Sequence, residues 1–228
     1  MIVIRNKTLR SLLKILIPFA AIPALVLLGL YAVEAEQYLL VSFGIAVLAL
    51  VLFFTGFERK ITGSRRMVIA AVMTALCVAG RFIPFFKPIT ALTVITAVYL
   101  GGECGFFVGA LAACLSNFTF GQGPWTPFQM LAWGLIGLFA GYFSRYLKNS
   151  RALMCIYGVI SGMVYSLIMD VWSVMWYSGG LNAELYFAAM MTAVPHTLLY
   201  AVSNFVFLWF LAKPFGDKLE RVRIKYGV

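Results

Sequence analysis

Long apolar runs, separated by short polar or glycine-rich segments, fill most of the chain. A helix needs about 20 apolar residues to cross the ~30 Å hydrocarbon core of a bilayer, and most of the runs approach that length. The pattern predicts an all-α polytopic membrane helix bundle. Its eight spans are expected at about residues 15–33, 38–57, 67–84, 89–100, 106–120, 125–144, 152–177 and 185–212.

The composition supports a membrane environment. Hydrophobic residues make up 63% of the 228 positions and charged residues only 11%. Ordinary soluble domains carry about 25% charged residues. A chain this apolar lacks the polar side chains to cover a water-exposed surface, so membrane lipid must surround much of it. The expected location is the bacterial cell membrane, with multiple passes.

The basic residues are distributed unevenly between the two sides of the predicted bundle. Of the 18 Lys and Arg residues, 16 fall in the segments on the N-terminal side, and only Arg81 and Lys87 fall on the other. Such a bias orients both termini toward the cytoplasm. It also accounts for the net charge of +10 without a nucleic-acid partner, and none is expected.

The charged segments divide the chain into two regions. The apolar run from Ile15 exceeds the 7–15 residues of a signal-peptide core, which indicates a retained span, ended by Glu34 and Glu36. A charged linker from Glu58 to Arg66 then separates an N-terminal pair of transmembrane helices, residues 1–60, from a six-helix core, residues 61–228. The core ends in a short basic cytoplasmic tail that begins at Lys213.

The segment from Lys87 to Trp133 has the sequence pattern of a binding site. A glycine turn at residues 101–105 joins two short apolar runs, and a second break, Gly-Gln-Gly-Pro-Trp-Thr-Pro, follows at residues 121–127. A loop this rich in Gly, Pro and Trp on a membrane protein predicts the rim of a pocket.

The remaining unusual polar and aromatic side chains fall toward the outer face of the predicted topology. Trp125, Gln129 and Trp133 step by four residues and therefore share one helix face. An ionisable group at membrane depth usually faces a polar interior and often marks function. Asp170 has the alternative role of fixing helix register, and His196 that of a core histidine. The candidate substrate-binding residues are Arg81, Lys87, Asn117, Gln122, Trp125, Gln129, Trp133, Asp170 and His196.

Catalytic and metal-binding patterns are missing from the sequence. It contains no HExxH, Walker or GxSxG motif, so an intrinsic ATPase, protease or lipase lacks its parts. Cys77, Cys104, Cys114 and Cys155 are too far apart for a CxxC site and are expected to be buried small hydrophobes. We therefore expect no enzyme, no cofactor and no metal.

The third predicted span carries Ala71, Ala75 and Ala79 at four-residue spacing, a smooth strip on which another helix can pack closely. In three features the chain resembles the substrate-binding S component of energy-coupling factor (ECF) vitamin transporters. These features are the alanine strip, the short helices around Gly101 and the segment FGQGPWTPFQMLAWG at residues 120–134. The resemblance covers residues 67–212. The alternative role of the alanine strip is packing against another helix of the same chain.

The resemblance implies a mechanism and partners. An S component captures a vitamin near the outer surface and docks through the alanine strip on a T component driven by two ABC-type ATPases. Residues 81–88 would be the lid of the pocket. The GPWTPFQM version resembles the subgroup linked to cobalamin or precursors such as dimethylbenzimidazole, although riboflavin or a queuosine-type base would suit the same side chains. The two N-terminal spans depart from the six-helix pattern.

Two other function classes remain open at the level of sequence. A proton-coupled secondary transporter of a small heteroaromatic would use Asp170 and His196 as a proton relay, although the paired inverted halves typical of many such proteins are not apparent. A membrane enzyme or structural subunit is the third class.

Overall fold

The computed structural model describes all residues except 1–3, 5, 33–36, 57–59 and 227–228. Every regular element in the described part is helical, which confirms the predicted all-α class. The N-terminal region contains α1 (Lys7–Leu16), the π-helical η1 (Ile17–Ala21), α2 (Ile22–Ala32) and α3 (Tyr38–Thr55). The core contains α4 (Lys60–Gly80), α5 (Ile89–Leu100), α6 (Gly102–Phe120), α7 (Trp125–Tyr142), α8 (Ser144–Asn149), α9 (Arg151–Ser178) and α10 (Ala183–Tyr226).

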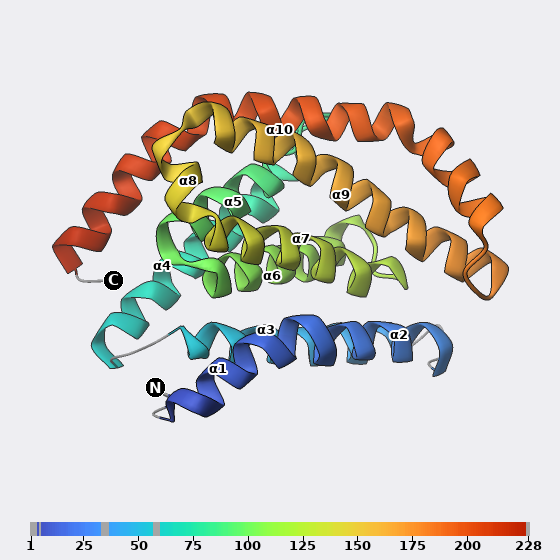
Figure 1. The fold of residues 1–228 in the computed structure, drawn as a ribbon, viewed down its shortest axis with the longest axis horizontal. Helices are drawn as coiled ribbons and strands as arrows, with labels where there is room; N and C mark the ends of the chain where they lie inside the picture. Colours follow the sequence, from blue (N-terminus) through green and yellow to red (C-terminus); the bar gives the residue numbers. More distant parts are fainter. Residues whose placement is uncertain (1–3, 5, 33–36, 57–59, 227–228) are drawn as a thin grey trace.

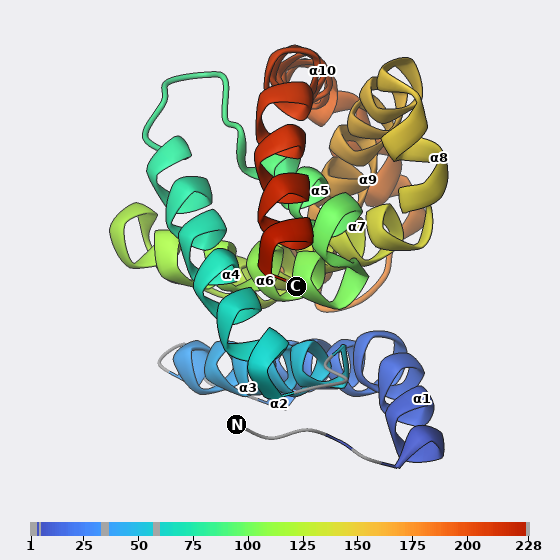
Figure 2. The ribbon, with the colours of Figure 1, turned by 90° about the vertical axis from the view of Figure 1, so that its left-hand side faces the viewer.

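The helices form three layers (Figure 1). Helices α1–α3 lie beneath α6 and α7, while α9 and the long, curved α10 cover the opposite side. The short helix α5 is enclosed between them, and α4 stands at one side of the bundle (Figure 2). Both termini lie at the same end of the molecule, as expected for a chain whose two ends face one side of a membrane.

All eight predicted apolar helices are observed, with changed boundaries. Within the described residues, five stretches are long and apolar enough to cross a membrane: Lys7–Tyr31, Tyr38–Thr55, Gly102–Phe120, Arg151–Ser178 and Ala183–Lys225. Helix α5 is apolar but has only 12 residues.

Several boundaries differ from those of the predicted spans, including that of α6, which begins at Gly102 inside the predicted glycine turn. Helix α4 begins at Lys60, inside the predicted charged linker, and α10 continues through the predicted tail to Tyr226. The short helix α8 lies between the predicted sixth and seventh spans. Charged residues do not stop a helix when they lie beyond the apolar segment, because Lys, Arg and Glu are good helix formers. Glu34, Glu36 and Glu58 lie outside the described residues.

Glycines allow α6 and α7 to pack in backbone contact. A Cβ atom on Gly137 would lie 2.5 Å from the backbone of Gly105, and one on Gly141 would lie 2.2 Å from the backbone of Gly102. Both distances are far below van der Waals contact. The two helices can therefore approach this closely only with glycine at these positions, as in small-residue helix pairs of membrane proteins.

The N-terminal helices share the hydrophobic core of the six-helix region. Phe53 on α3 stacks on Phe107 on α6 with ring centroids 4.8 Å apart, and Lys14 on α1 forms an ion pair with Glu103 at the start of α6. Ile22 and Ile45 are fully buried in the same cluster as residues of α5 and α6. The N-terminal helices therefore pack directly against the helices of the core. The division of the chain into residues 1–60 and residues 61–228 stays a prediction from the sequence.

All four cysteines are buried and none is in a disulfide, which agrees with their predicted role as small hydrophobic residues.

Candidate binding site

A cavity of about 50 Å³ lies where the α4–α5 loop meets α5, α7, α9 and α10. Four of the nine predicted binding residues line it, namely Arg81, Lys87, Gln129 and Trp133. The full lining consists of Arg81, Lys87, Ile89, Thr90, Gln129, Trp133, Gly162, Tyr165, Tyr200 and Asn204. The structure thus brings together polar and aromatic groups from across the six-helix core.

The Arg81 guanidinium is the most deeply buried cation of this site. Only 8% of Arg81 is exposed. Its Nη1 donates to Ser116 Oγ and to Asn117 Oδ1, the latter at 2.8 Å. Its Cζ lies 5.4 Å from the ring centroid of Trp133 and 5.0 Å from that of Phe120. Hydrogen bonds on one side and aromatic faces on others hold the guanidinium at the cavity wall.

Asn117 lies behind the cavity and links Arg81 to helix α7. Its Nδ2 donates to Thr126 Oγ1 at 2.8 Å and to Gln129 Oε1 at 2.9 Å, while its Oδ1 accepts from Arg81. The amide therefore uses both its donor and its acceptor groups. This predicted binding residue positions Arg81 and Gln129 instead of lining the cavity itself.

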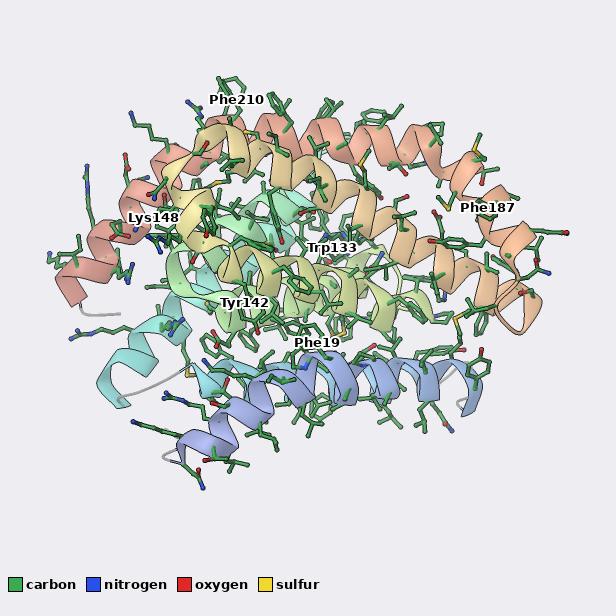
Figure 3. The ribbon with its side chains drawn as sticks, in the orientation of Figure 1. Phe19, Trp133, Tyr142, Lys148, Phe187 and Phe210 are labelled. Atoms are coloured by element: carbon green, nitrogen blue, oxygen red, sulfur yellow. The ribbon has the colours of Figure 1, made fainter. Side chains whose placement is uncertain are left out.

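Aromatic rings form one wall. Trp133 Nε1 donates to Thr90 Oγ1 at 3.1 Å, which fixes the indole between α5 and α7. The indole stacks on Tyr165 of α9 with centroids 4.6 Å apart, and Tyr165 meets Tyr200 of α10 edge-on at 5.4 Å. Figure 3 shows Trp133 in the middle of the bundle, between α7 and the α9–α10 layer.

Positive charge in the cavity is not balanced by protein carboxylates. None of the described residues that line it is acidic, and the buried Arg81 Nε has no hydrogen-bond partner. Burial lowers the pKa of Lys87, and the nearby charge of Arg81 lowers it further. Buried charges are normally paired. The cavity is therefore suited to a ligand that brings hydrogen-bond acceptors.

The α4–α5 loop closes one side of the cavity and is tied to α10. The Lys87 backbone N–H donates to Ser203 Oγ at 3.0 Å, and Ser203 Oγ donates to the Lys87 carbonyl at 3.3 Å. Phe85 has φ 62°, a conformation that bulky residues rarely adopt, and its side chain is exposed. The loop is thus held at its Lys87 end and carries a strained residue two positions before it.

Two predicted binding residues at the α6–α7 break have structural contacts. Gln122 Nε2 donates to the carbonyl of Cys114 at 2.9 Å, which ties the loop back to the last turns of α6. Trp125 meets Trp172 of α9 edge-on at 5.9 Å. Neither lines the cavity, because the loop turns them toward the helix end and toward α9.

The structure does not bring Asp170 and His196 into the cavity. Asp170 lines a separate, largely apolar groove between α9 and α10. It follows Tyr165 by five residues, which places the two about 140° apart around the helix. His196 is exposed on α10. They line no common cavity in the described structure, so the proton-relay alternative is not favoured.

Sequence reasoning missed several residues of the site. The predicted binding residues do not include Thr90, Ser116, Tyr165, Tyr200 or Asn204. Asn204 lies one helical turn after Tyr200, so a polar-aromatic stripe on the long apolar helix was an available signal. Thr90 and Ser116 gave none, because small hydroxyl residues are common in membrane helices.

The predicted docking strip lies on an open face of α4. Ala71, Ala75 and Ala79 are exposed, whereas Ala70, Met73 and Cys77 on the other face of the helix are buried. The strip is therefore not used for packing within the chain.

Comparison with known proteins agrees with these features. The family model described as "ECF-type riboflavin transporter, S component" matches residues 62–220, whereas no curated protein and no solved structure gives a match. The match leaves out the N-terminal helices. It confirms the S-component resemblance and leaves the cobalamin-like subgroup unconfirmed. Members of the family are non-enzymatic components of membrane transport. The chain belongs to the ECF-type riboflavin transporter S component family and is an integral membrane protein.

Proposed function

We propose that the chain captures a flat heteroaromatic vitamin or vitamin precursor in the Arg81–Trp133 cavity and delivers it to partner subunits for ATP-driven uptake. One observation carries the proposal: a buried guanidinium, whose charge no lining carboxylate balances and whose Nε has no hydrogen-bond partner, lies beside a stacked Trp–Tyr wall. A flat ring system with acceptor atoms on its edge would satisfy both features, since rings stack on Trp133 and Tyr165 and acceptors face Arg81.

Three ligands are the first candidates. Riboflavin is a candidate because the matching family is described as riboflavin transporter S components. Dimethylbenzimidazole and cobalamin itself are candidates because of the GPWTPFQM resemblance. Riboflavin and dimethylbenzimidazole are flat ring systems with an acceptor nitrogen at the ring edge, and riboflavin adds ring carbonyls.

The size of the cavity favours a small ligand. Its volume is about 50 Å³. Ligand sites of drug-sized molecules commonly measure about 300–1,000 Å³. The site must therefore expand when it binds, and a ring system of two or three rings requires less expansion than intact cobalamin. The α4–α5 loop, held to α10 through Ser203, is the segment whose displacement would open the cavity most directly.

The exposed alanine strip supports docking on a T component, which two ABC-type ATPases would drive. The N-terminal helices pack on α6 and α7 and leave the strip open. Replacing Ala71 and Ala75 by Leu should leave ligand binding intact and abolish uptake by the assembled transporter. Uptake at the wild-type rate would contradict the docking assignment.

Calorimetry on the purified protein tests ligand binding. Riboflavin, dimethylbenzimidazole and cobalamin are titrated separately, without ATP and without partner subunits. Saturable one-to-one binding of one of them is the expected result. Failure of all three would contradict the proposed ligand class.

Two variants test the site. Arg81→Gln should weaken binding by roughly tenfold to a hundredfold, because a hydrogen bond from a charged group contributes about 1.5–3 kcal/mol. His196→Gln, a control that changes an exposed residue, should bind like the wild type. Equal losses in the two variants would show that the cavity is not the binding site.

A further inference from the structure

A second cavity of about 220 Å³ lies at the end of the molecule that carries both termini. Residues of α5, the α8–α9 corner and α10 form its wall, and it shares no residue with the Arg81–Trp133 cavity. Its lining consists of Tyr99, Leu147, Lys148, Arg151, Met154, Ala212, Lys213 and Asp217.

Cations predominate in this lining. Lys148, Arg151 and Lys213 contribute three positive charges, and Asp217 is the one acidic residue among the described residues of the wall. Lys148 Nζ forms an ion pair with Glu220 Oε2 at 2.6 Å. Within the described part of the chain, neither Arg151 nor Lys213 pairs with a carboxylate, so two cations are available to an added anion.

One of the two available cations, Arg151, lies beside aromatic side chains at the surface of the bundle. The Arg151 guanidinium lies 4.3 Å from the ring centroid of Trp209, whose indole stacks on Phe205. Phe210 is 66% exposed and points away from the bundle, while Lys148 lies where α8 meets the end of α10 (Figure 3). Trp and Tyr typically mark the level of lipid headgroups.

We propose that this cavity binds the phosphate of an anionic phospholipid of the cytoplasmic leaflet. The phosphate would accept hydrogen bonds from Arg151 and Lys213, and the acyl chains would lie along the apolar surface of α9 and α10. Basic pockets between transmembrane helices on the cytoplasmic side recognise such headgroups. A soluble anion such as inorganic phosphate would use the same cations, but it would leave the adjoining apolar surface without a role.

Native mass spectrometry of the full chain, released from nanodiscs, tests the proposal. Discs that contain phosphatidylglycerol are compared with discs of phosphatidylcholine alone. One phosphatidylglycerol should remain bound after the annular lipid is removed, and phosphatidylcholine should not. Equal retention of the two lipids would overturn the proposal.

Charge variants distinguish binding in this cavity from general attraction of the lipid to a positively charged surface. The double variant Arg151→Gln/Lys213→Gln should lose about fivefold in retention for each removed cation. The control Arg145→Gln/Lys218→Gln removes two exposed cations outside the lining and should retain the lipid. Equal losses in the two double variants would overturn the assignment.

Two further measurements sharpen the test. Asp217→Asn removes the acidic group of the lining and should strengthen retention by about fivefold, an effect that damaged folding cannot produce. Inorganic phosphate added in excess should leave the bound lipid in place. Displacement of the lipid by phosphate, or weaker retention in Asp217→Asn, would overturn the proposal.

Discussion

Helices α6 and α7 pack very differently from α9 and α10. The first pair is in direct backbone contact through glycines, and its interior residues are almost completely buried. The second pair leaves large apolar side chains exposed and a groove of about 310 Å³ between its helices. The α6–α7 pair is therefore a tightly packed scaffold. The α9–α10 pair also meets closely at Gly162, where a Cβ atom would lie 2.9 Å from the backbone of Ala201, so its looser packing is confined to the segments that border the groove.

The binding site takes groups from both helix pairs. The scaffold and the adjoining loop provide Arg81, Gln129 and Trp133, whose positions are fixed by hydrogen bonds and glycine packing. The α9–α10 pair provides Tyr165 and Tyr200. This division indicates how a small cavity can admit a larger ligand: α9, α10 and the Lys87 end of the loop move, while Arg81, Gln129 and Trp133 stay in place. Three predictions test this comparison.

The largest effect is expected at the α6–α7 contact. Gly137→Ala would place a methyl group 2.5 Å from the backbone of Gly105 and force the helices apart, with a loss of about 3 kcal/mol in the free energy of unfolding. Thermal unfolding in detergent measures this loss of stability. Gly180→Ala is the matched control, because no atom lies within 4 Å of the added methyl group. Similar stability of the two variants would mean that the scaffold is not rigid.

An intermediate effect is expected at the wall contributed by α9. Tyr165→Leu removes the ring that stacks on Trp133 and should weaken ligand binding by roughly tenfold, since an aromatic pair contributes about 0.5–1.5 kcal/mol beyond its burial. Calorimetry with whichever of the three candidate ligands binds the wild type measures the change in affinity. Tyr165→Phe keeps the ring and should bind nearly as well as the wild type; a Phe variant as weak as the Leu variant would exclude stacking as the cause.

The smallest effect is expected where the loop is attached to α10. Ser203→Ala removes both hydrogen bonds to the Lys87 backbone and should accelerate ligand release about fivefold, because a hydrogen bond contributes about 1 kcal/mol. Stopped-flow fluorescence measures the release rate. Ser173→Ala is the control, since that hydroxyl donates only to the Met169 carbonyl of its own helix. An unchanged release rate in Ser203→Ala would place the opening segment elsewhere.

Some of the site could be predicted from the sequence because its residues are unusual where they occur. Arg81 and Lys87 are the two cations on the predicted outer side, and Gln129 and Trp133 share a helix face after a glycine- and proline-rich break. All four line the cavity. Asp170 and His196 lie outside this cavity. The sequence could not show this, because polarity at membrane depth does not reveal in which direction a side chain points.

The sequence alone determined the helical class, the eight apolar helices and the charge asymmetry between their ends. These properties depend on hydrophobicity and helix periodicity, which are local and can be read from neighbouring residues. Only the tertiary structure decided which polar groups meet, because this depends on the rotation of each helix and on contacts between distant segments. Arg81 meets Ser116 and Asn117 across 35 and 36 residues, and Lys87 meets Ser203 across 116. Side-chain packing between helices fixes those rotations, and no periodic pattern within one helix specifies them.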